Sequence, residues 1–237
     1  MATQEPIQLY RVLNDMVNDA FDHIVLQLCL QKERFGRRTF YLCGVAPGVG
    51  TTTIAVELSI SLALAGWRTL LLDCDLRKAS TYKRLNEGAT VGLADYIRGQ
   101  AELSRIITPT NWQGLDYVPS GRVGTASPLQ LLYSSRMRDL TGQLGEGYDF
   151  VLIDGPASST AVDAEFLALQ ADGAILVAAM DGSRKRLLED AKRRLEGLNA
   201  NLIGVIENKV ELGEYRQYEK NFDYFNRQRF LKKPAKG

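Results

Sequence analysis

Histidine and cysteine are scarce in this chain: one His, His23, and three Cys occur among 237 residues. A single histidine argues against multi-histidine metal sites and histidine-based catalytic triads. Cys29, Cys43 and Cys74 form an odd set without metal-ligand spacing, which indicates reduced thiols in a cytosolic protein. No apolar run approaches ~18 residues and no signal-peptide pattern opens the sequence, so we expect neither a transmembrane span nor secretion.

Charge of one sign is also lacking. Lys and Arg total 29 and Asp and Glu total 28, a formal net charge of +1. No overall field therefore favours nucleic acid or an acidic substrate, and no nucleic-acid partner is expected. The apolar content of 45% is ample for a folded core.

Several short apolar runs are present, and they alternate with longer helical patterns. Residues 69–73 and 149–154 are continuous apolar runs ending in an acid, which is typical of strands buried on both faces of a parallel sheet. Further strands are expected at 39–43, 173–179 and 202–206, and helices at 6–35, 51–65, 128–145, 160–170 and 183–198. This alternation predicts an α/β fold with a doubly wound, mostly parallel sheet flanked by helices.

We divide the chain into an N-terminal helical segment (1–36), an α/β core (37–211) and a basic, aromatic C-terminal tail (212–237), as one domain overall. The tail's basic residues outnumber its acids, which suits either an anionic membrane surface or plain solvation.

The most informative stretch is GVAPGVGTTT at residues 44–53, between an expected strand and an expected helix. It has the form of a phosphate-binding loop, in which backbone N–H groups cradle phosphates and the motif ends G-K-[ST]. Thr51 stands where the lysine belongs, and Thr52 stands where the magnesium-binding hydroxyl belongs. The residues expected to surround a phosphate are Pro47, Gly48, Val49, Gly50, Thr51, Thr52 and Thr53.

Acidic residues end two further strands. Asp73 and Asp75 follow one buried run, and Asp154 ends another. Ligands of open α/β sheets bind at the carboxyl ends of strands, so these acids are expected to approach one Mg²⁺ directly or through water. Each feature alone has a plainer interpretation, a simple turn or a helix cap. The glycine-rich loop and the two acidic strand ends, occurring together in this order, favour a nucleotide site.

These motifs resemble the bacterial tyrosine kinases of capsule and exopolysaccharide synthesis, the CpsD/CapB proteins and Wzc-type cytoplasmic domains, within the MinD/ParA branch of P-loop proteins. The family pattern D-x-D-x-R-K matches Asp73, Asp75, Arg77 and Lys78, and a Walker B motif matches residues 152–157. Residues 92–107, 127–140, 162–168 and 172–177 fit as well, so the similarity runs from about residue 15 to 212.

The resemblance implies Mg²⁺ and ATP or ADP as cofactors. It implies catalytic roles for Asp73, Asp75 and Asp154, metal binding by Thr52, Asp73 and Asp154, and a base contact near Asn208. It implies a partner, the cytoplasmic part of a membrane chain-length-determinant (Wzz/CapA-like) protein, and a cytoplasmic location peripheral to the inner face of the bacterial membrane. The candidate phosphoacceptors are Tyr215, Tyr218 and Tyr224, for which the alternative is a role as packing anchors of the tail.

The chain departs from that family in three places. Thr51 replaces the loop lysine, and Arg77 or Lys78 are the substitutes considered; the MinD/ParA signature lysine would fall at Ala46. Asp22 and Val25 replace the two arginines of the family's assembly motif, so that motif is degraded, while a homo-oligomer stays an open alternative. The tail tyrosines are fewer and more widely spread than the family's cluster.

Three functions follow from this pattern. The first is a degenerate tyrosine-kinase-like protein, a regulatory partner in polysaccharide synthesis and export. The second is a working ATPase or tyrosine autokinase of the same pathway that uses a substitute cation. The third is a positioning ATPase of the MinD/ParA type.

Overall fold

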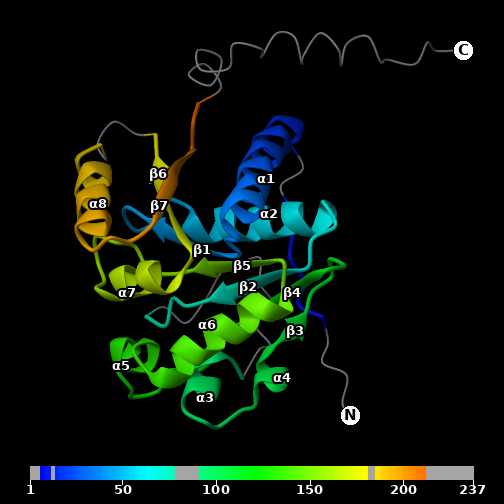
Figure 1. Ribbon diagram of the computed structural model, residues 1–237, viewed down its shortest axis with the longest axis vertical. Coiled ribbons are helices and arrows are strands. Elements are labelled where there is room, and N and C mark those ends of the chain that lie inside the picture. The colour runs from blue at the N-terminus through cyan, green and yellow to red at the C-terminus, as the bar shows by residue number, and fades with distance from the viewer. Residues whose placement is uncertain (1–5, 12–13, 78–90, 181–184, 212–237) are drawn as a thin grey trace, which may run out of the picture.

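A computed structural model describes residues 6–11, 14–77, 91–180 and 185–211. These residues form a sheet of seven strands in the order β3-β4-β2-β5-β1-β6-β7, in which every neighbouring pair is parallel except β3 and β4 (Figure 1). The strands are β1 (Thr39–Gly44), β2 (Thr69–Asp73), β3 (Thr108–Pro109), β4 (Leu115–Val118), β5 (Phe150–Asp154), β6 (Gly173–Ala179) and β7 (Leu202–Asn208).

Helices cover both faces of this sheet. They are α1 (Asp15–Phe35), α2 (Thr51–Leu64), α3 (Leu93–Ile97), α4 (Leu103–Ile106), α5 (Pro128–Leu132), α6 (Ser135–Gly147), α7 (Asp163–Gln170) and α8 (Lys185–Gly197). Helix α2 packs on the central strands with α1 above it, while α6, α7 and α8 pack on the opposite face (Figure 1). The predicted doubly wound α/β fold is confirmed.

The core lies between these layers. Every residue of β1, β2, β5 and β6 is buried, which explains why these strands are continuous apolar runs rather than alternating ones. Helix α2 is buried from Ile54 to Ala63 because α1 covers the side that turns away from the sheet. Each fully buried leucine or isoleucine here contributes about 1.5–3 kcal/mol to the free energy of unfolding.

The helix predicted over residues 6–35 is wrong in its first third. Helix α1 begins at Asp15, where the Asn14 side chain accepts hydrogen bonds from Met16 N and Val17 N as an N-cap. It ends at Gly36, whose φ of 71° gives a left-handed C-cap. Residues 6–11 instead form no helix, and Ile7 makes an isolated bridge with Thr110, beside β3.

Contacts with residues distant in sequence explain why this segment is not helical. Leu9 is fully buried, and its backbone N–H donates to Asn111 Oδ1 at 2.7 Å. Its carbonyl accepts from Asn111 Nδ2 at 3.1 Å and from Trp112 Nε1 at 2.9 Å. These bonds satisfy the N–H and C=O groups of Leu9, which in a helix would have been bonded within the helix itself.

Two further differences concern the middle of the chain. The helix predicted over 128–145 is two helices, α5 and α6, because Ser134 caps α6 by accepting a hydrogen bond from Met137 N. Strands β3 and β4 and helices α3 and α4 had no prediction as elements. Lys78 and the tail with Tyr215, Tyr218 and Tyr224 lie outside the described residues. No helix in the described part of the chain is long and apolar enough to cross a bilayer.

Candidate functional site: a phosphate loop without its lysine

The loop between β1 and α2 has the backbone that an anion cradle needs. Gly48 and Gly50 have φ values of 76° and 95°, in the left-handed region that favours glycine. Gly50 is also the N-cap of α2, so the positive end of that helix dipole faces the loop. Thr52 and Thr53 follow, half-buried, in the first turn of α2. The loop therefore fits a phosphate group through backbone N–H groups.

Thr51 fits here because residue 44, at the end of β1, is a glycine and has no side chain. A Cβ atom built on Gly44 would lie 2.4 Å from Thr51 Oγ1 and 3.0 Å from Val49 Cγ2. Real Cβ atoms do not approach other atoms so closely. Thr51 stands where the phosphate-loop motif has its lysine, so this departure from the motif falls on the contact with Gly44. The threonine hydroxyl occupies this place near the loop and carries no charge.

The end of β7 holds the outside of the loop. Asn208 Nδ2 donates to Val49 O at 2.8 Å, and Lys209 Nζ donates to Gly48 O at 2.8 Å. The approach is close, since a Cβ on Gly50 would lie 2.3 Å from Asn208 Nδ2. Asn208 thus stands beside the predicted site as a loop contact, and its role with a nucleotide base stays a prediction. Lys209 was missed, although a lysine after a strand on the same sheet edge was a usable signal.

Two of the predicted acids meet at this edge of the sheet. Asp73 and Asp154 are register partners on the neighbouring strands β2 and β5, and each is 4% exposed. Asp75 N donates to Asp73 Oδ1 at 3.0 Å, which holds the turn after β2.

A cage of three carboxylates is not formed. Within the described part of the chain, no group of three or more His, Cys, Asp or Glu side chains could hold a metal ion. Mg²⁺ commonly takes one or two carboxylates and completes its shell with water and phosphate oxygens. Asp73 and Asp154 beside an anion cradle fit that kind of magnesium site, with Thr52 as the candidate hydroxyl ligand.

Burial makes Asp73 reluctant to ionise. It raises the pKa of Asp73 to about 6, and the negative charge of Asp75 adds to the effect. Hydrogen bonds from Asp75 N, Ser120 and Tyr117 oppose this shift, the last with Tyr117 Oη 3.4 Å from Asp73 Oδ2. A carboxyl with a pKa near 6 can hold or release a proton close to neutral pH.

Arg77 is committed to a buried partner. Its Nε lies 2.6 Å from Asp163 Oδ2, and the Asp163 side chain is 1% exposed in the first turn of α7. The pair ties the turn after β2 to the helix that follows β5. Because Arg77 is ion-paired with Asp163, it is a poor substitute for the loop lysine. Sequence reasoning missed Asp163, whose signal was an acid in a helix first turn.

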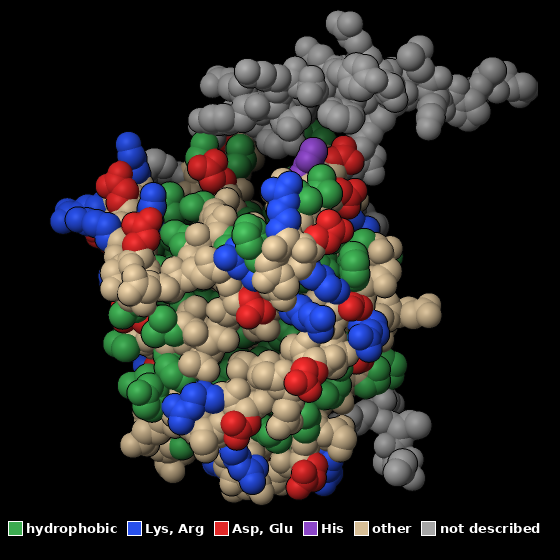
Figure 2. Space-filling view, viewed as in Figure 1, with side chains coloured by type: hydrophobic (Ala, Val, Ile, Leu, Met, Phe, Trp, Pro, Cys, Tyr) green, Lys and Arg blue, Asp and Glu red, His purple; other side chains and the backbone are tan. Residues whose placement is uncertain are grey.

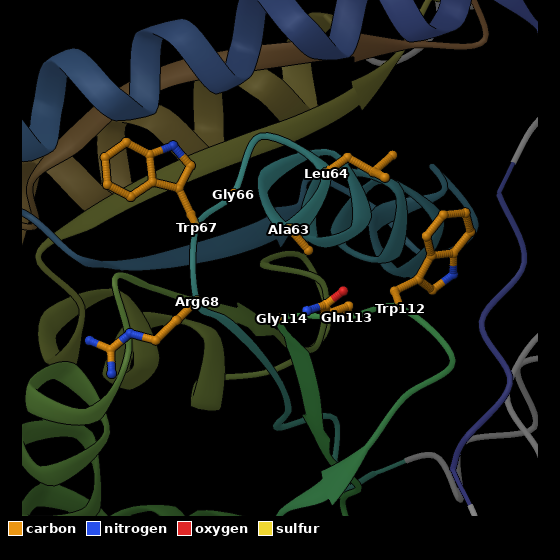
Figure 3. A pocket seen from close by; sticks show the side chains of 8 residues that line it. All are labelled: Ala63, Leu64, Gly66, Trp67, Arg68, Trp112, Gln113 and Gly114. Carbon is orange, nitrogen blue, oxygen red and sulfur yellow. The ribbon is translucent and has the colours of Figure 1, made fainter.

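One cavity of about 400 Å³ lies far from the loop. It opens at the C-terminal end of α2 and the starts of β2 and β4, the opposite edge of the sheet, between Ala63, Leu64 and Gly114 (Figure 3). The Trp67 indole and the Arg68 guanidinium point away from its centre (Figure 3). On the face drawn in Figure 2, acidic and basic side chains are interspersed, as the near-neutral charge leads one to expect.

The family model of the AAA domain matches residues 43–183. A tyrosine-protein kinase CpsD of Streptococcus agalactiae is 34% identical over 187 residues, covering 76% of this chain and 80% of that protein.

Solved structures of similar proteins share this fold. The crystal structure of the chimerical protein CapA2B2 superposes with a TM-score of 0.69 and 28% identity, covering 73% of this chain and 76% of that one. The septum site-determining protein MinD of Pyrococcus horikoshii, complexed with Mg-ADP, gives a TM-score of 0.60 at 25% identity, over 72% of this chain and 69% of that one.

Proposed function

We propose a function for this chain on the ground that it belongs to the family of bacterial CpsD-type tyrosine-protein kinases. It is a degenerate member that acts as a regulatory partner in capsule or exopolysaccharide biosynthesis and export. It holds ADP or ATP with Mg²⁺ in the loop after β1 and transfers phosphoryl groups poorly. The observation that carries this proposal is Thr51 in the place of the loop lysine, packed against Gly44.

The chemistry of phosphoryl transfer explains why one residue matters so much. Catalysis depends on positioning and on stabilising charge at the transferred group, and little covalent chemistry is left to the protein. Loss of a single aimed donor commonly lowers the rate by about 10²–10³. A threonine side chain is shorter than lysine and uncharged, so the expected loss is at least of that size. Nucleotide itself would bind through loop amides, which the substitution leaves in place.

A membrane-bound partner completes the proposal. The similarity to the CapA2B2 chimera supports docking on the cytoplasmic part of a chain-length-determinant protein of the CapA/Wzz type. The chain would then work in the cytoplasm at the inner face of the membrane. A regulatory role needs nucleotide binding and a conformational response, and it does not need phosphoryl transfer. A phosphate loop that keeps its backbone but lacks its lysine suits such a role.

The test is phosphotyrosine formation. The purified full chain is incubated with Mg–ATP, alone and with the cytoplasmic segment of a chain-length-determinant protein from its host, and phosphotyrosine is measured by mass spectrometry. We expect none above the level of an Asp154→Asn variant, which lacks one of the two acids beside the loop. Phosphotyrosine that forms in the native chain and disappears in Asp154→Asn would overturn the proposal.

One observation favours a second function, an active autokinase with a substitute cation. Lys209 Nζ lies on the loop at Gly48 O, while Asp73 and Asp154 are both in place. The same phosphotyrosine assay separates the two functions, because only the active kinase gives a signal that depends on Asp154.

A further inference from the structure

Two consecutive residues at the end of β7 bond two consecutive carbonyl groups of the phosphate loop. Asn208 Nδ2 donates to Val49 O and Lys209 Nζ donates to Gly48 O, each at 2.8 Å. In a loop of the nest type, N–H groups turn to the anion side and carbonyl groups turn outward. Donors on the outer side therefore favour the arrangement in which the N–H groups face an anion.

The backbone bends at Lys209 through the left-handed region. Lys209 has a φ of 58°, one of two non-glycine residues with positive φ in the described part of the chain. Its own N–H donates to Asn208 Oδ1 at 2.8 Å, which helps to hold the bend. An unusual backbone conformation that persists beside a binding loop is a reason to look for a function there.

The charge of Lys209 is not neutralised by its contact. Gly48 O is a neutral carbonyl, and no carboxylate lies within ion-pair distance of Lys209 in the described part of the chain. By contrast, Arg77 is paired with the carboxylate of Asp163. Lys209 thus brings a positive charge to the rim of a loop that lacks its own lysine.

We propose that Lys209 is the resident cation of this anion site: from its place on Gly48 O, its positive charge stabilises a diphosphate group held by the N–H groups of the loop, in part of the electrostatic role that the missing lysine at position 51 would have. The ligand class is a nucleoside diphosphate or inorganic pyrophosphate. This inference rests on the proposed function in one respect, that the loop holds such a group. Asn208 acts as a positioning residue that keeps the loop against β7.

The experiment measures binding rather than turnover. The full chain is titrated calorimetrically with Mg–ADP and with Mg–pyrophosphate. The variants are Lys209→Met, which keeps length without charge, and Lys209→Arg, which keeps charge. Lys192→Met is the matched control, since Lys192 is an exposed α8 residue paired with Glu196. The double variant Lys209→Met/Thr51→Lys returns a cation to the loop.

We expect Lys209→Met to bind both ligands about tenfold more weakly, the size expected for one partly screened charge. Lys209→Arg and Lys192→Met should bind as the native chain does, and the double variant should recover affinity. The dependence of affinity on salt should be shallower in Lys209→Met.

Three results would overturn the inference: unchanged affinity in Lys209→Met, no recovery in the double variant, or no binding of either ligand by the native chain. A weaker affinity that merely follows a lower melting temperature of the unliganded variant would also overturn it, because the contact would then be structural. Native phosphotyrosine formation with a tenfold loss in Lys209→Met would instead overturn only the proposed function and support the inference.

Discussion

At the scale of single residues, Gly44 and Thr51 form a matched pair. A Cβ on Gly44 would meet Thr51 Oγ1 at 2.4 Å, so each residue limits what the other can be. We predict that Gly44→Ala destabilises the native chain by about 1–3 kcal/mol, the usual cost of overpacking. The cost should fall in a Thr51→Ala background, which removes the hydroxyl.

A double-mutant cycle measured by urea unfolding checks this pair. The expected coupling is at least about 1 kcal/mol, within the range for residues in direct contact. Val49 Cγ2, at 3.0 Å from the same Cβ position, keeps the relief partial. Purely additive effects of the two substitutions would contradict the proposed match.

Asp149 links stability to pH at the opposite edge of the sheet. Burial disfavours its ionised form, but hydrogen bonds from Lys32 and Arg68 and the charge of Lys32 outweigh this and lower its pKa. The Asp149 carboxylate lies 3.0 Å from Lys32 Nζ, which also lies 4.4 Å from the Trp67 ring centroid.

A carboxyl that ionises more readily in the folded state stabilises the fold above its unfolded pKa of about 3.9. That stability is lost as pH falls through the lower folded value. We therefore predict that Lys32→Met lowers the free energy of unfolding near neutral pH and makes its decline below about pH 4 shallower. Urea unfolding over a pH series measures both; equal slopes in the two proteins would count against the ion pair. An exposed control, Lys192→Met, should leave the slope as it is.

At the scale of elements, the central strands could be predicted from sequence because burial on both faces makes them continuous apolar runs. The strands expected at 39–43, 69–73 and 173–179 agree with β1, β2 and β6 to within one residue. The prediction failed where tertiary contacts override local pattern. Residues 6–11 carry helix-like spacing yet form no helix, because Asn111 and Trp112 bond both backbone groups of Leu9.

The candidate site shows the same division. The loop glycines and Asp73 and Asp154 were predictable from motifs, since each motif ends a strand and parallel strands share an edge. Lys209 and Asp163 were not predicted, because their roles depend on side-chain contacts with Gly48 and Arg77 that are 161 and 86 residues distant in sequence.

The N-terminal segment at residues 6–11 gives a prediction for a single element. Asn111→Ala removes both hydrogen bonds to Leu9 and leaves the N–H group of a fully buried residue without its acceptor. We expect a loss of about 1–3 kcal/mol and faster hydrogen exchange at Leu9, with exchange in α2 changed little. Exchange measured by mass spectrometry on native and variant protein tests this. Unaltered exchange at Leu9 would show that the segment is held by other contacts.

At the scale of the whole molecule, the residues on α1 bear on whether the chain assembles with copies of itself. Val25 and Asp22, both on α1, stand where the family's assembly motif has arginines, and Val25 is 8% exposed on the side of α1 that packs into the core. A surface without these cations is not expected to assemble through that motif. We predict a monomer in sedimentation velocity of the purified full chain at about micromolar concentration. A defined oligomer would contradict this.

We infer that the fold keeps a nucleotide cradle, while Thr51 removes the side chain that would reach the terminal phosphate. Thermal-shift titration of the native chain and Thr51→Lys, each with Mg–ADP and Mg–ATP, tests it most directly. A ligand at ~100 times its dissociation constant stabilises the folded state by about 2.7 kcal/mol, an easily measured shift. We predict a shift in the native chain with both nucleotides, and in Thr51→Lys a larger gain for Mg–ATP than for Mg–ADP. No shift in the native chain, or equal shifts in the two proteins, would contradict the account.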